Sequence, residues 1–212
     1  PYTPTDNQLD PTCAPGDANC YVSIFPTQED VVVNGLTIGK GGGDIDTNTV
    51  VGYQAGISNT TGVSNVFIGY QAGESNTTGG SNIAIGRGAL GSNSSSSANV
   101  AIGRNSLTSN TGASNVAFGY FSGSSNITGN QNVFIGRETG AGTTGSGHVL
   151  LGFGAGYNAV GDNKLYIENS SSQTPLIYGD FTNNWLGVNT LNTNVASTLH
   201  VTGSGSTSST YT

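Results

Sequence analysis

Short apolar triplets recur along the chain between polar, turn-forming residues, and each triplet is followed by a glycine. Triplets such as 66–68 and 133–135 hold β-branched and aromatic residues, which is the pattern of a short strand bounded by turns. The glycines that follow the triplets are Gly52, Gly69, Gly86, Gly103, Gly119, Gly136 and Gly152. Their successive separations are 17, 17, 17, 16, 17 and 16 residues, so the sequence predicts a repeat architecture.

Each repeat predicts a short strand, a bend at the glycine, a second short strand such as "YQAG" or "RGAL", and a polar turn. Stretches such as "GESNTTGGSN" gather residues that favour turns and disfavour helix, so we expect an all-β chain. One coil alone cannot bury its apolar residues, and neighbouring coils must therefore stack about 4.8 Å apart. The expected fold is a parallel β-solenoid, or β-roll, of about seven coils of 16–17 residues.

Two columns of the repeat carry predictions about its interior and its partners. The residue before the triplet is asparagine in six copies and His148 in the seventh, which predicts a ladder of amides at Asn48, Asn65, Asn82, Asn99, Asn115 and Asn132. The middle residue of a triplet points to the face opposite its two neighbours. We expect the neighbours to fill the roll and the middle column to face partner chains, since it is apolar in every copy. This predicted homotrimer interface is Val50, Phe67, Ala84, Ala101, Ala117, Phe134 and Leu150.

A third column is aromatic or basic in every copy. It follows the triplet glycine and consists of Tyr53, Tyr70, Arg87, Arg104, Tyr120, Arg137 and Phe153. One interpretation is a basic and aromatic stripe that binds a glycan or another ligand. The other is a set of long side chains that cover a seam between coils or subunits.

Composition narrows the possible functions. The 212 residues include 34 glycines, only 8% are charged, and the formal net charge is −7 with five basic residues. This balance argues against binding to nucleic acid or to an anionic membrane surface, and no apolar run approaches the ~20 residues of a membrane span. No Ser-His-Asp arrangement or phosphate loop can be defended, so we expect neither an enzyme nor a cofactor.

Several smaller motifs suggest modification, metal binding or acid–base chemistry. Cys13 and Cys20 enclose a loop with proline and glycine and predict a local disulfide. Residues 44–48 ("DIDTN") place oxygen ligands at alternate positions, but they lack the glycine and distant glutamate of a standard calcium loop. Glu168 and Asp180 could form an acid pair, although solvated turn carboxylates are the simpler interpretation. N-glycosylation sequons occur at Asn59, Asn76, Asn93, Asn126 and Asn169, in a composition where turn chemistry alone produces them.

The organisation outside the repeats follows from changes in composition. Residues 1–30 hold five of the six prolines and the cysteine loop, and predict an attachment segment. Residues 31–47 predict a first, capping coil, 48–160 the repeat array and 161–203 a C-terminal β cap or neck, in which "KLYIENS" and "PLIYGDF" alternate like a hairpin. Residues 204–212 have the serine-, threonine- and glycine-rich composition of a linker.

The motifs also resemble known families. "NIAIG" (82–86) and "NVAIG" (99–103) resemble the head repeats of trimeric autotransporter adhesins. "VNGLTIGKGGG" (33–43), "GYQAG" with "SNTTG", and "NKLYIENSSSQTPLIYGDFTNNWLGVNT" (163–190) are similar to phage tail-fibre-like proteins of bacterial genomes. The resemblance covers about residues 31–203 and implies a left-handed β-roll assembled as a homotrimeric extracellular fibre. The repeats are longer than the usual repeats of adhesin heads, and no membrane anchor is recognised.

These observations predict a structural protein of a bacterial cell surface or a virion. The leading hypothesis is a homotrimeric fibre or adhesin shaft that mediates surface attachment through an unidentified receptor, and one version of it polymerises head to tail into filaments. A phage receptor-binding segment is an alternative. Another is an ice- or glycan-binding solenoid that uses an array of turn threonines, namely Thr60, Thr61, Thr77, Thr78, Thr111 and Thr128.

Overall fold

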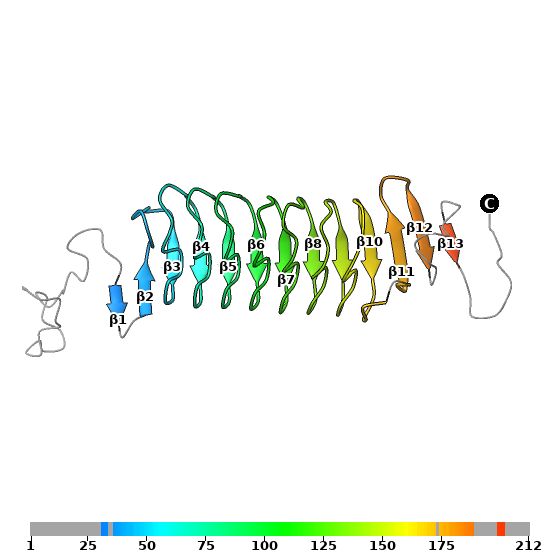
Figure 1. Ribbon diagram of the computed structural model, residues 1–212, viewed down its shortest axis with the longest axis horizontal. Coiled ribbons are helices and arrows are strands. Elements are labelled where there is room, and N and C mark those ends of the chain that lie inside the picture. The colour runs from blue at the N-terminus through cyan, green and yellow to red at the C-terminus, as the bar shows by residue number, and fades with distance from the viewer. Residues whose placement is uncertain (1–30, 34–35, 173, 189–198, 202–212) are drawn as a thin grey trace, which may run out of the picture.

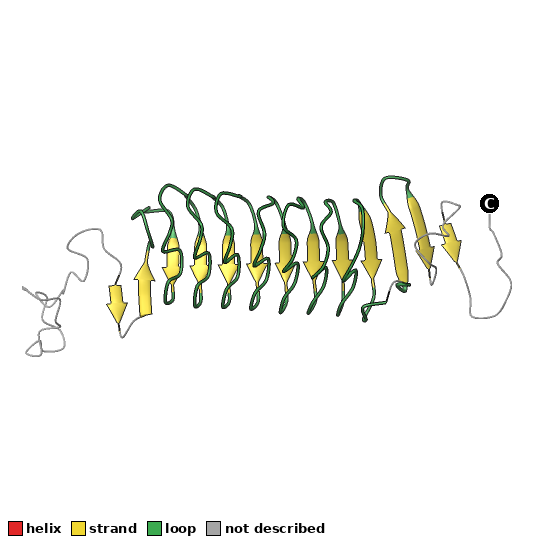
Figure 2. Ribbon diagram, in the orientation of Figure 1, coloured by secondary structure: helices red, strands yellow, loops and turns green. Residues whose placement is uncertain are grey.

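A computed structural model describes residues 31–33, 36–172, 174–188 and 199–201, and all strands of this part of the chain form one sheet (Figure 1). The strands follow one another in sequence order from β1 to β13, and no helix occurs among these residues (Figure 2). The prediction of an all-β solenoid of about seven coils is confirmed. The left-handed sense that the resemblance implies stays a prediction.

Parallel, in-register strands form the body of the rod. Its strands are β3 (Thr49–Val51), β4 (Val66–Ile68), β5 (Ile83–Ile85), β6 (Val100–Ile102), β7 (Val116–Phe118), β8 (Val133–Ile135), β9 (Val149–Leu151) and β10 (Lys164–Ile167). Each strand pairs with the strand of the next coil, so that Phe67 lies between Val50 and Ala84. Equivalent residues of successive coils therefore form straight columns along the rod.

Antiparallel strands close both ends of the described sheet. β1 (Val31–Val33) and β2 (Leu36–Gly39) form a hairpin, and β2 also pairs with β3. At the other end β10 and β11 (Ile177–Asp180) form the antiparallel hairpin that the alternating pattern predicts. β12 (Trp185–Val188) is antiparallel to β11, and β13 (Leu199–Val201) pairs parallel with β12. The parallel array itself includes β10 and therefore ends at Ile167, seven residues beyond position 160.

The second strand expected in each coil is wrong, because the chain returns through turns. In the second coil Gln71 and Gly73 both have positive φ, 56° and 58°. The Ala72 amide donates to the Gly69 carbonyl at 3.3 Å, and the Asn76 amide donates to the Gly73 carbonyl at 3.0 Å. Left-handed residues at alternate positions interrupt the pleat that a strand requires. We call residues 71–76 and their equivalents the return segments.

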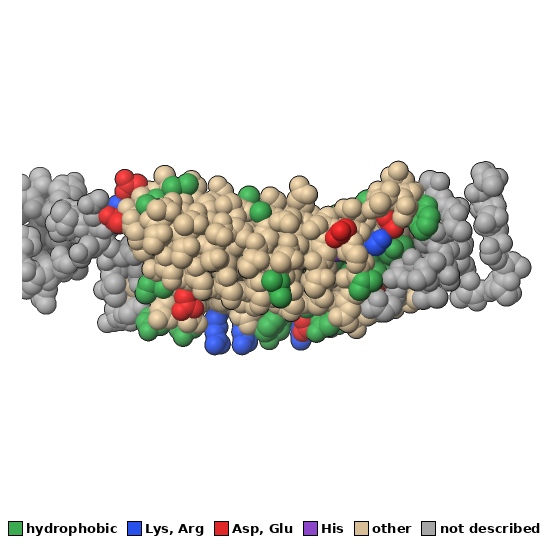
Figure 3. All heavy atoms as spheres, turned by 45° about the horizontal axis from the view of Figure 1, so that its top comes forward, with side chains coloured by type: hydrophobic (Ala, Val, Ile, Leu, Met, Phe, Trp, Pro, Cys, Tyr) green, Lys and Arg blue, Asp and Glu red, His purple; other side chains and the backbone are tan. Residues whose placement is uncertain are grey.

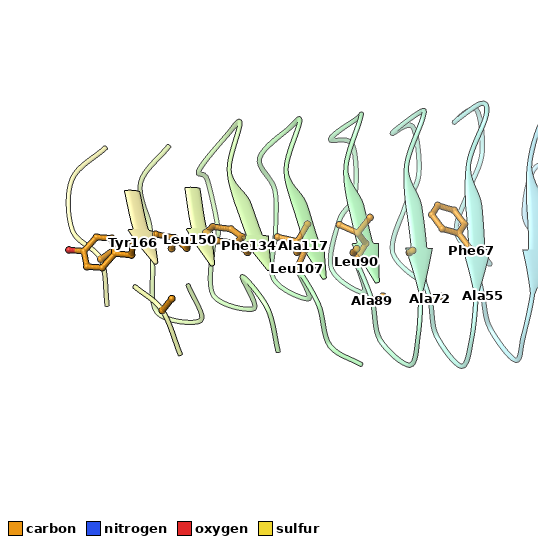
Figure 4. Packing of buried hydrophobic residues seen from close by; sticks show 14 of the residues in the cluster. Ala55, Phe67, Ala72, Ala89, Leu90, Leu107, Ala117, Phe134, Leu150 and Tyr166 are labelled. Atoms are coloured by element: carbon orange, nitrogen blue, oxygen red, sulfur yellow. The ribbon is translucent and has the colours of Figure 1, made fainter. Parts of the chain in front are cut away.

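The orientation predicted for the strands is also wrong. The middle residue of each triplet lies inside the single chain, as Phe67 and Phe134 do (Figure 4), with at most 1% of its surface exposed. Its two neighbours are half-buried or exposed and face outward. The return segment lies under the middle residue and covers it with small side chains such as Ala72 and Ala89. The predicted trimer-interface column is therefore the core of the roll: Val50, Phe67, Ala84, Ala101, Ala117, Phe134 and Leu150.

The core of a coil lies between its strand and its return segment, and in most coils a large side chain on one of them faces a small residue on the other. Where the strand carries Phe67, the return segment carries Gly73, whose added Cβ would lie 2.5 Å from two ring carbons of Phe67. In the next coil the strand carries Ala84 and the return segment carries the fully buried Leu90. These coils are thus filled by one large side chain each, from the strand or from the return segment. The coil of Ala117 and Gly123 has no large side chain at either position, and Phe134 and Leu107 of the adjacent coils lie against Gly123 instead.

Two columns of buried asparagines close the roll beside the core. The backbone N–H of Asn65 donates to Oδ1 of Asn48 at 2.8 Å, and the side-chain Nδ2 of Asn65 donates to the Gly79 carbonyl at 2.9 Å. A second column of buried asparagines, which includes four of the five sequon asparagines, meets the first at the same carbonyl. Nδ2 of Asn76 donates to Gly79 O at 3.0 Å and to Oδ1 of Asn59 at 2.9 Å. The turn is therefore bonded both within a coil and between coils.

The size complementarity predicts a specific rescue. Gly73→Leu alone should destabilise the roll by about 1–3 kcal/mol through overpacking, and Phe67→Ala alone by about 3–5 kcal/mol through a cavity. The two together should recover about 2 kcal/mol relative to their sum, because Leu fills the space that the ring leaves. Urea unfolding followed by circular dichroism measures all three variants against the wild type.

The neighbouring coil provides the matched control. Ala84→Phe combined with Leu90→Gly moves the large side chain from the return segment to the strand, the reverse of the first pair, and should show the same favourable coupling. Additive effects in both coils would refute the complementarity.

Candidate functional site: the outward sheet face and a ridge of aromatic and arginine side chains

The outward side of the parallel strands is apolar from Val51 to Ile167, and Thr49 at its start is polar. We call the outward side chains of β3 to β10 the sheet face; they are half-buried or exposed, with Phe118 39% and Ile135 43% exposed. No residue of this face is charged. Its members are Thr49, Val51, Val66, Ile68, Ile83, Ile85, Val100, Ile102, Val116, Phe118, Val133, Ile135, Val149, Leu151, Leu165 and Ile167.

A hollow of about 360 Å³ lies at the C-terminal end of the sheet face. Leu151, Ile167 and Leu176 supply its apolar lining, and Glu168 and Asn169 stand at its polar side. The Glu168 carboxylate in this hollow serves the hairpin itself, since it accepts hydrogen bonds from the backbone N–H groups of Leu176 and Asn169 at 2.8 and 2.7 Å. The hollow therefore extends the apolar face, with a hydrogen-bonded carboxylate at its polar side.

The column after the triplet glycines stands along the edge where the parallel strands end, and we call its seven residues the ridge. Basic side chains project from this edge with hydrophobic side chains between them (Figure 3). The rings of Tyr53 and Tyr70 are stacked with centroids 5.5 Å apart, and the Arg87 guanidinium lies 5.5 Å from the Tyr70 ring. The ridge side chains thus contact one another along the rod and do not enter the core.

The second half of the ridge repeats this stacking. Tyr120 has the guanidinium groups of Arg104 and Arg137 each 5.5 Å from its ring centroid, and Arg137 also lies 5.6 Å from the Phe153 ring. Such cation–π contacts hold arginine side chains in a fixed row at about 0.5–1 kcal/mol each when exposed. Arg137 has an ion pair with Glu138 at 2.9 Å.

Between the two stacks, two arginines stand side by side. Arg87 and Arg104 occupy the same position in adjacent coils, and no ion pair to either is found among the residues that the structure describes. A groove of about 350 Å³ follows along the rod, lined by Tyr120, Phe121, Ser124, Ser125, Arg137, Glu138, Ala141 and Tyr157. The ridge therefore concentrates three of the five cations of the chain beside exposed aromatic rings.

Four of the five sequons lie inside the roll. Asn59, Asn76, Asn93 and Asn126 are at most 2% exposed, and their Nδ2 atoms donate to turn carbonyls, as Asn126 does to Gly129 at 3.0 Å. A glycan on any of them would need the turn to open. Asn169 is exposed.

The acidic groups singled out in the sequence have local structural partners. Lys40 forms ion pairs with Asp44 and Asp46, at 3.2 and 2.5 Å, and its hydrogen bond to Asp46 lowers the pKa of that carboxyl. No group of three or more potential metal ligands is found among the described residues. Both carboxylates of the candidate calcium segment thus share Lys40 as their ion-pair partner.

Glu168 and Asp180 are not brought together. The register of β10 with β11 pairs Lys164 with Asp180 and Ile167 with Ile177, which places the two carboxylates toward opposite ends of the paired strands. Burial by itself raises the pKa of the Asp180 carboxyl, but hydrogen bonds from Lys164, at 2.7 Å, and from Asn183 outweigh burial and lower it. Asp180 therefore anchors the hairpin as a carboxylate.

His148 continues the asparagine ladder with an imidazole. Its backbone N–H donates to Oδ1 of Asn132 at 2.8 Å, and its Nδ1 accepts from the Lys164 amide at 3.3 Å. Nε2 is buried without a hydrogen bond of normal geometry. Burial lowers the pKa of the ring and nearby Lys164 adds to this, while Asp162 and the Gly161 carbonyl act in the opposite direction. The net lowering means that the folded roll holds His148 in its neutral form.

Two further predictions concern the array of turn threonines and the disulfide. The hydroxyl groups of Thr60, Thr77 and Thr111 donate to carbonyls of the next coil at 2.7–2.9 Å, so part of the proposed threonine array bonds within the roll. Cys13 and Cys20 lie outside the described residues, and the disulfide stays a prediction.

Comparisons with protein-family models, with curated proteins and with solved structures found no match. Among the described residues, no helix has the length and hydropathy to cross a membrane. The surfaces themselves are therefore the basis for a functional proposal.

The His148 environment predicts acid sensitivity at the end of the parallel array. Because the folded pKa is below the ordinary 6.5, the unfolded chain binds the proton more readily. The contribution of His148 to the free energy of unfolding is therefore complete above pH 6.5. It is lost as the pH falls from 6.5 toward the pKa that His148 has in the folded chain. The melting temperature of the wild type should fall more between about pH 7.5 and about pH 5 than that of His148→Asn, at ~2–4 °C per ~1 kcal/mol.

His148→Asn restores the asparagine of the other coils and leaves Asp162, Lys164 and Asp180 in place, so it serves as the matched control. Parallel melting curves for the two proteins over this range would contradict the assignment.

Proposed function

We propose that this chain is a structural, non-enzymatic subunit of a homotrimeric fibre or adhesin shaft, which projects from a bacterial cell surface or a virion. The observation that carries the proposal is the sheet face, an uncharged apolar strip along the whole parallel array. A strand that is apolar on both sides is expected to be covered on both sides. One side is covered by the return segments, and the outward side has no cover within the described chain.

The spacing of the sheet face favours further copies of the same chain as its cover. Each coil presents two outward side chains, and the columns repeat at the strand spacing of about 4.8 Å over the eight strands β3 to β10. A surface with the same period meets these columns in register along its full length. A second solenoid of this sequence has that period by construction, whereas an ordinary globular surface does not.

The narrow width of the strip favours three copies around one axis. Each parallel strand from β3 to β9 is only three residues long, so the face is a narrow strip on a long rod. Three parallel rolls can direct their strips to a common axis and keep the return segments outside. The ridge then lies at the border of the contact, where arginine and aromatic residues are common in protein interfaces.

The same surfaces give less support to the alternatives. An ice-binding array would need a regular row of available threonine hydroxyl groups, and three of the six bond within the roll. A head-to-tail filament remains a further version of the fibre proposal, in which residues 1–30 provide the attachment segment.

A charge on the sheet face tests the assembly. Phe118→Glu should change the solution mass from about 64 kDa, three times the chain mass of 21.4 kDa, to that of the single chain. Three carboxylates would otherwise be buried together near the axis, at a cost of several kcal/mol each. Sedimentation equilibrium measures the mass, and circular dichroism verifies that the roll still forms.

Thr128→Glu is the matched control, because it places the same charge on an exposed turn of the same coil. It should leave the trimer intact. A wild-type chain that sediments as a monomer at micromolar concentration would refute the proposed assembly.

A further inference from the structure

We propose that the ridge is the docking surface for the acidic, proline-rich residues 1–30 of the same chain. The charge of the sequence separates sharply between these two parts. Residues 1–30 contain no lysine or arginine and five carboxylates, Asp6, Asp10, Asp17, Glu29 and Asp30. The rest of the chain has all five basic residues and seven acidic residues, so its net charge is −2 against −5 for the segment.

The unpaired arginines identify where the carboxylates bind. Lys40 and Lys164 already have aspartate partners, and Arg137 has Glu138. Arg87 and Arg104 are held by the rings of Tyr70 and Tyr120 and stand in adjacent coils, with no acidic partner in the described part of the chain. Two guanidinium groups at this spacing repel one another and attract a carboxylate placed between them.

The aromatic members of the ridge suit the prolines of the segment. Tyr53, Tyr70, Tyr120 and Phe153 expose 37–50% of their surface. Exposed aromatic rows with polar neighbours are a recurring surface for proline-rich chains, because proline loses little conformational entropy when its ring packs on an aromatic face. Residues 1–30 contain Pro1, Pro4, Pro11, Pro15 and Pro26.

The weak affinity expected for such a contact favours a segment tethered in the same chain over a free partner. Exposed ion pairs are individually weak, so a few of them with some ring packing would give a Kd of only about 1 mM for a free partner. A tether provides an effective concentration in the millimolar range, at which such a site is substantially occupied. Reach is not limiting, since Arg87 follows β5, four strand spacings or about 19 Å from β1, and 30 residues span up to about 100 Å.

Zero-length cross-linking of the full chain tests the contact. Arg87→Lys keeps the positive charge and introduces an amine, which a carbodiimide couples only to a carboxylate in direct contact. Peptide mass spectrometry should then find links from position 87 to the acidic residues of 1–30. The native Lys164 and Asp180 pair, 2.7 Å apart, reports that the coupling works.

Ser92→Lys is the matched control, since it places an amine on an exposed turn of the same coil, off the ridge. Position 87 should give at least about fivefold more links to the segment than position 92, which corresponds to ~1 kcal/mol of preference. The excess should disappear near ~1 M salt, where the screening length is about 3 Å. Adding Arg104→Glu to Arg87→Lys should also remove it, because the arginine pair is then lost.

Three outcomes would overturn the proposed docking within one chain. Equal links from positions 87 and 92 would overturn the docking. Co-folding unlabelled and nitrogen-15-labelled chains should give links within one isotope only, and frequent mixed links would show that another copy supplies the segment. Heparin binding that depends on Arg87 and Arg104, without links to residues 1–30, would assign the ridge to an acidic glycan. The solution mass of the same samples reports the trimer separately, since docking within one chain needs no assembly.

Discussion

Hydrogen bonding from each coil to the next is the constraint on which this structure depends. The strands are only three residues long in most coils, so the ladder between strands leaves much of each coil to be held by other groups. The asparagines that precede the strands supply these bonds with both ends of the side-chain amide: Oδ1 accepts from the backbone N–H of the next coil, and Nδ2 donates to a turn carbonyl. Since a buried amide without partners is costly, the turns are fixed in register with the strands.

This register determines how the core is filled. Columns of equivalent residues run straight along the rod, so each core side chain meets the same few positions of its own and adjacent coils. A large residue on the strand then requires glycine below it, as Phe134 does with Gly123 and Gly140. Where the strand carries Ala84 or Ala101, leucine replaces glycine on the return segment of the same coil. Ala117 lies in a coil with Gly123, where Phe134 and Leu107 of the adjacent coils fill the space.

Stacking also organises the outer surface. The strand side chains that point away from the core form the sheet face, and the residues just beyond the strands form the ridge of aromatic and arginine side chains. The proposed trimer contact uses the face, and the proposed docking of residues 1–30 uses the ridge. The two surfaces share an edge of the sheet, so assembly and docking would occur side by side along the same rod.

The sequence by itself determined the repeat length, the position of each short strand, the asparagine column and the closing hairpin, because glycine, asparagine and apolar triplets mark them at nearly constant spacing. It did not determine which side of the strand is inside. Both sides are apolar, and polarity could not distinguish Phe67 from Val66 and Ile68. A signal was present in the paired exchange of Phe67 with Gly73 and Ala84 with Leu90. Only the tertiary structure, in which left-handed turns bring the return segment beneath the strand, decided that the middle column is core and its neighbours are surface.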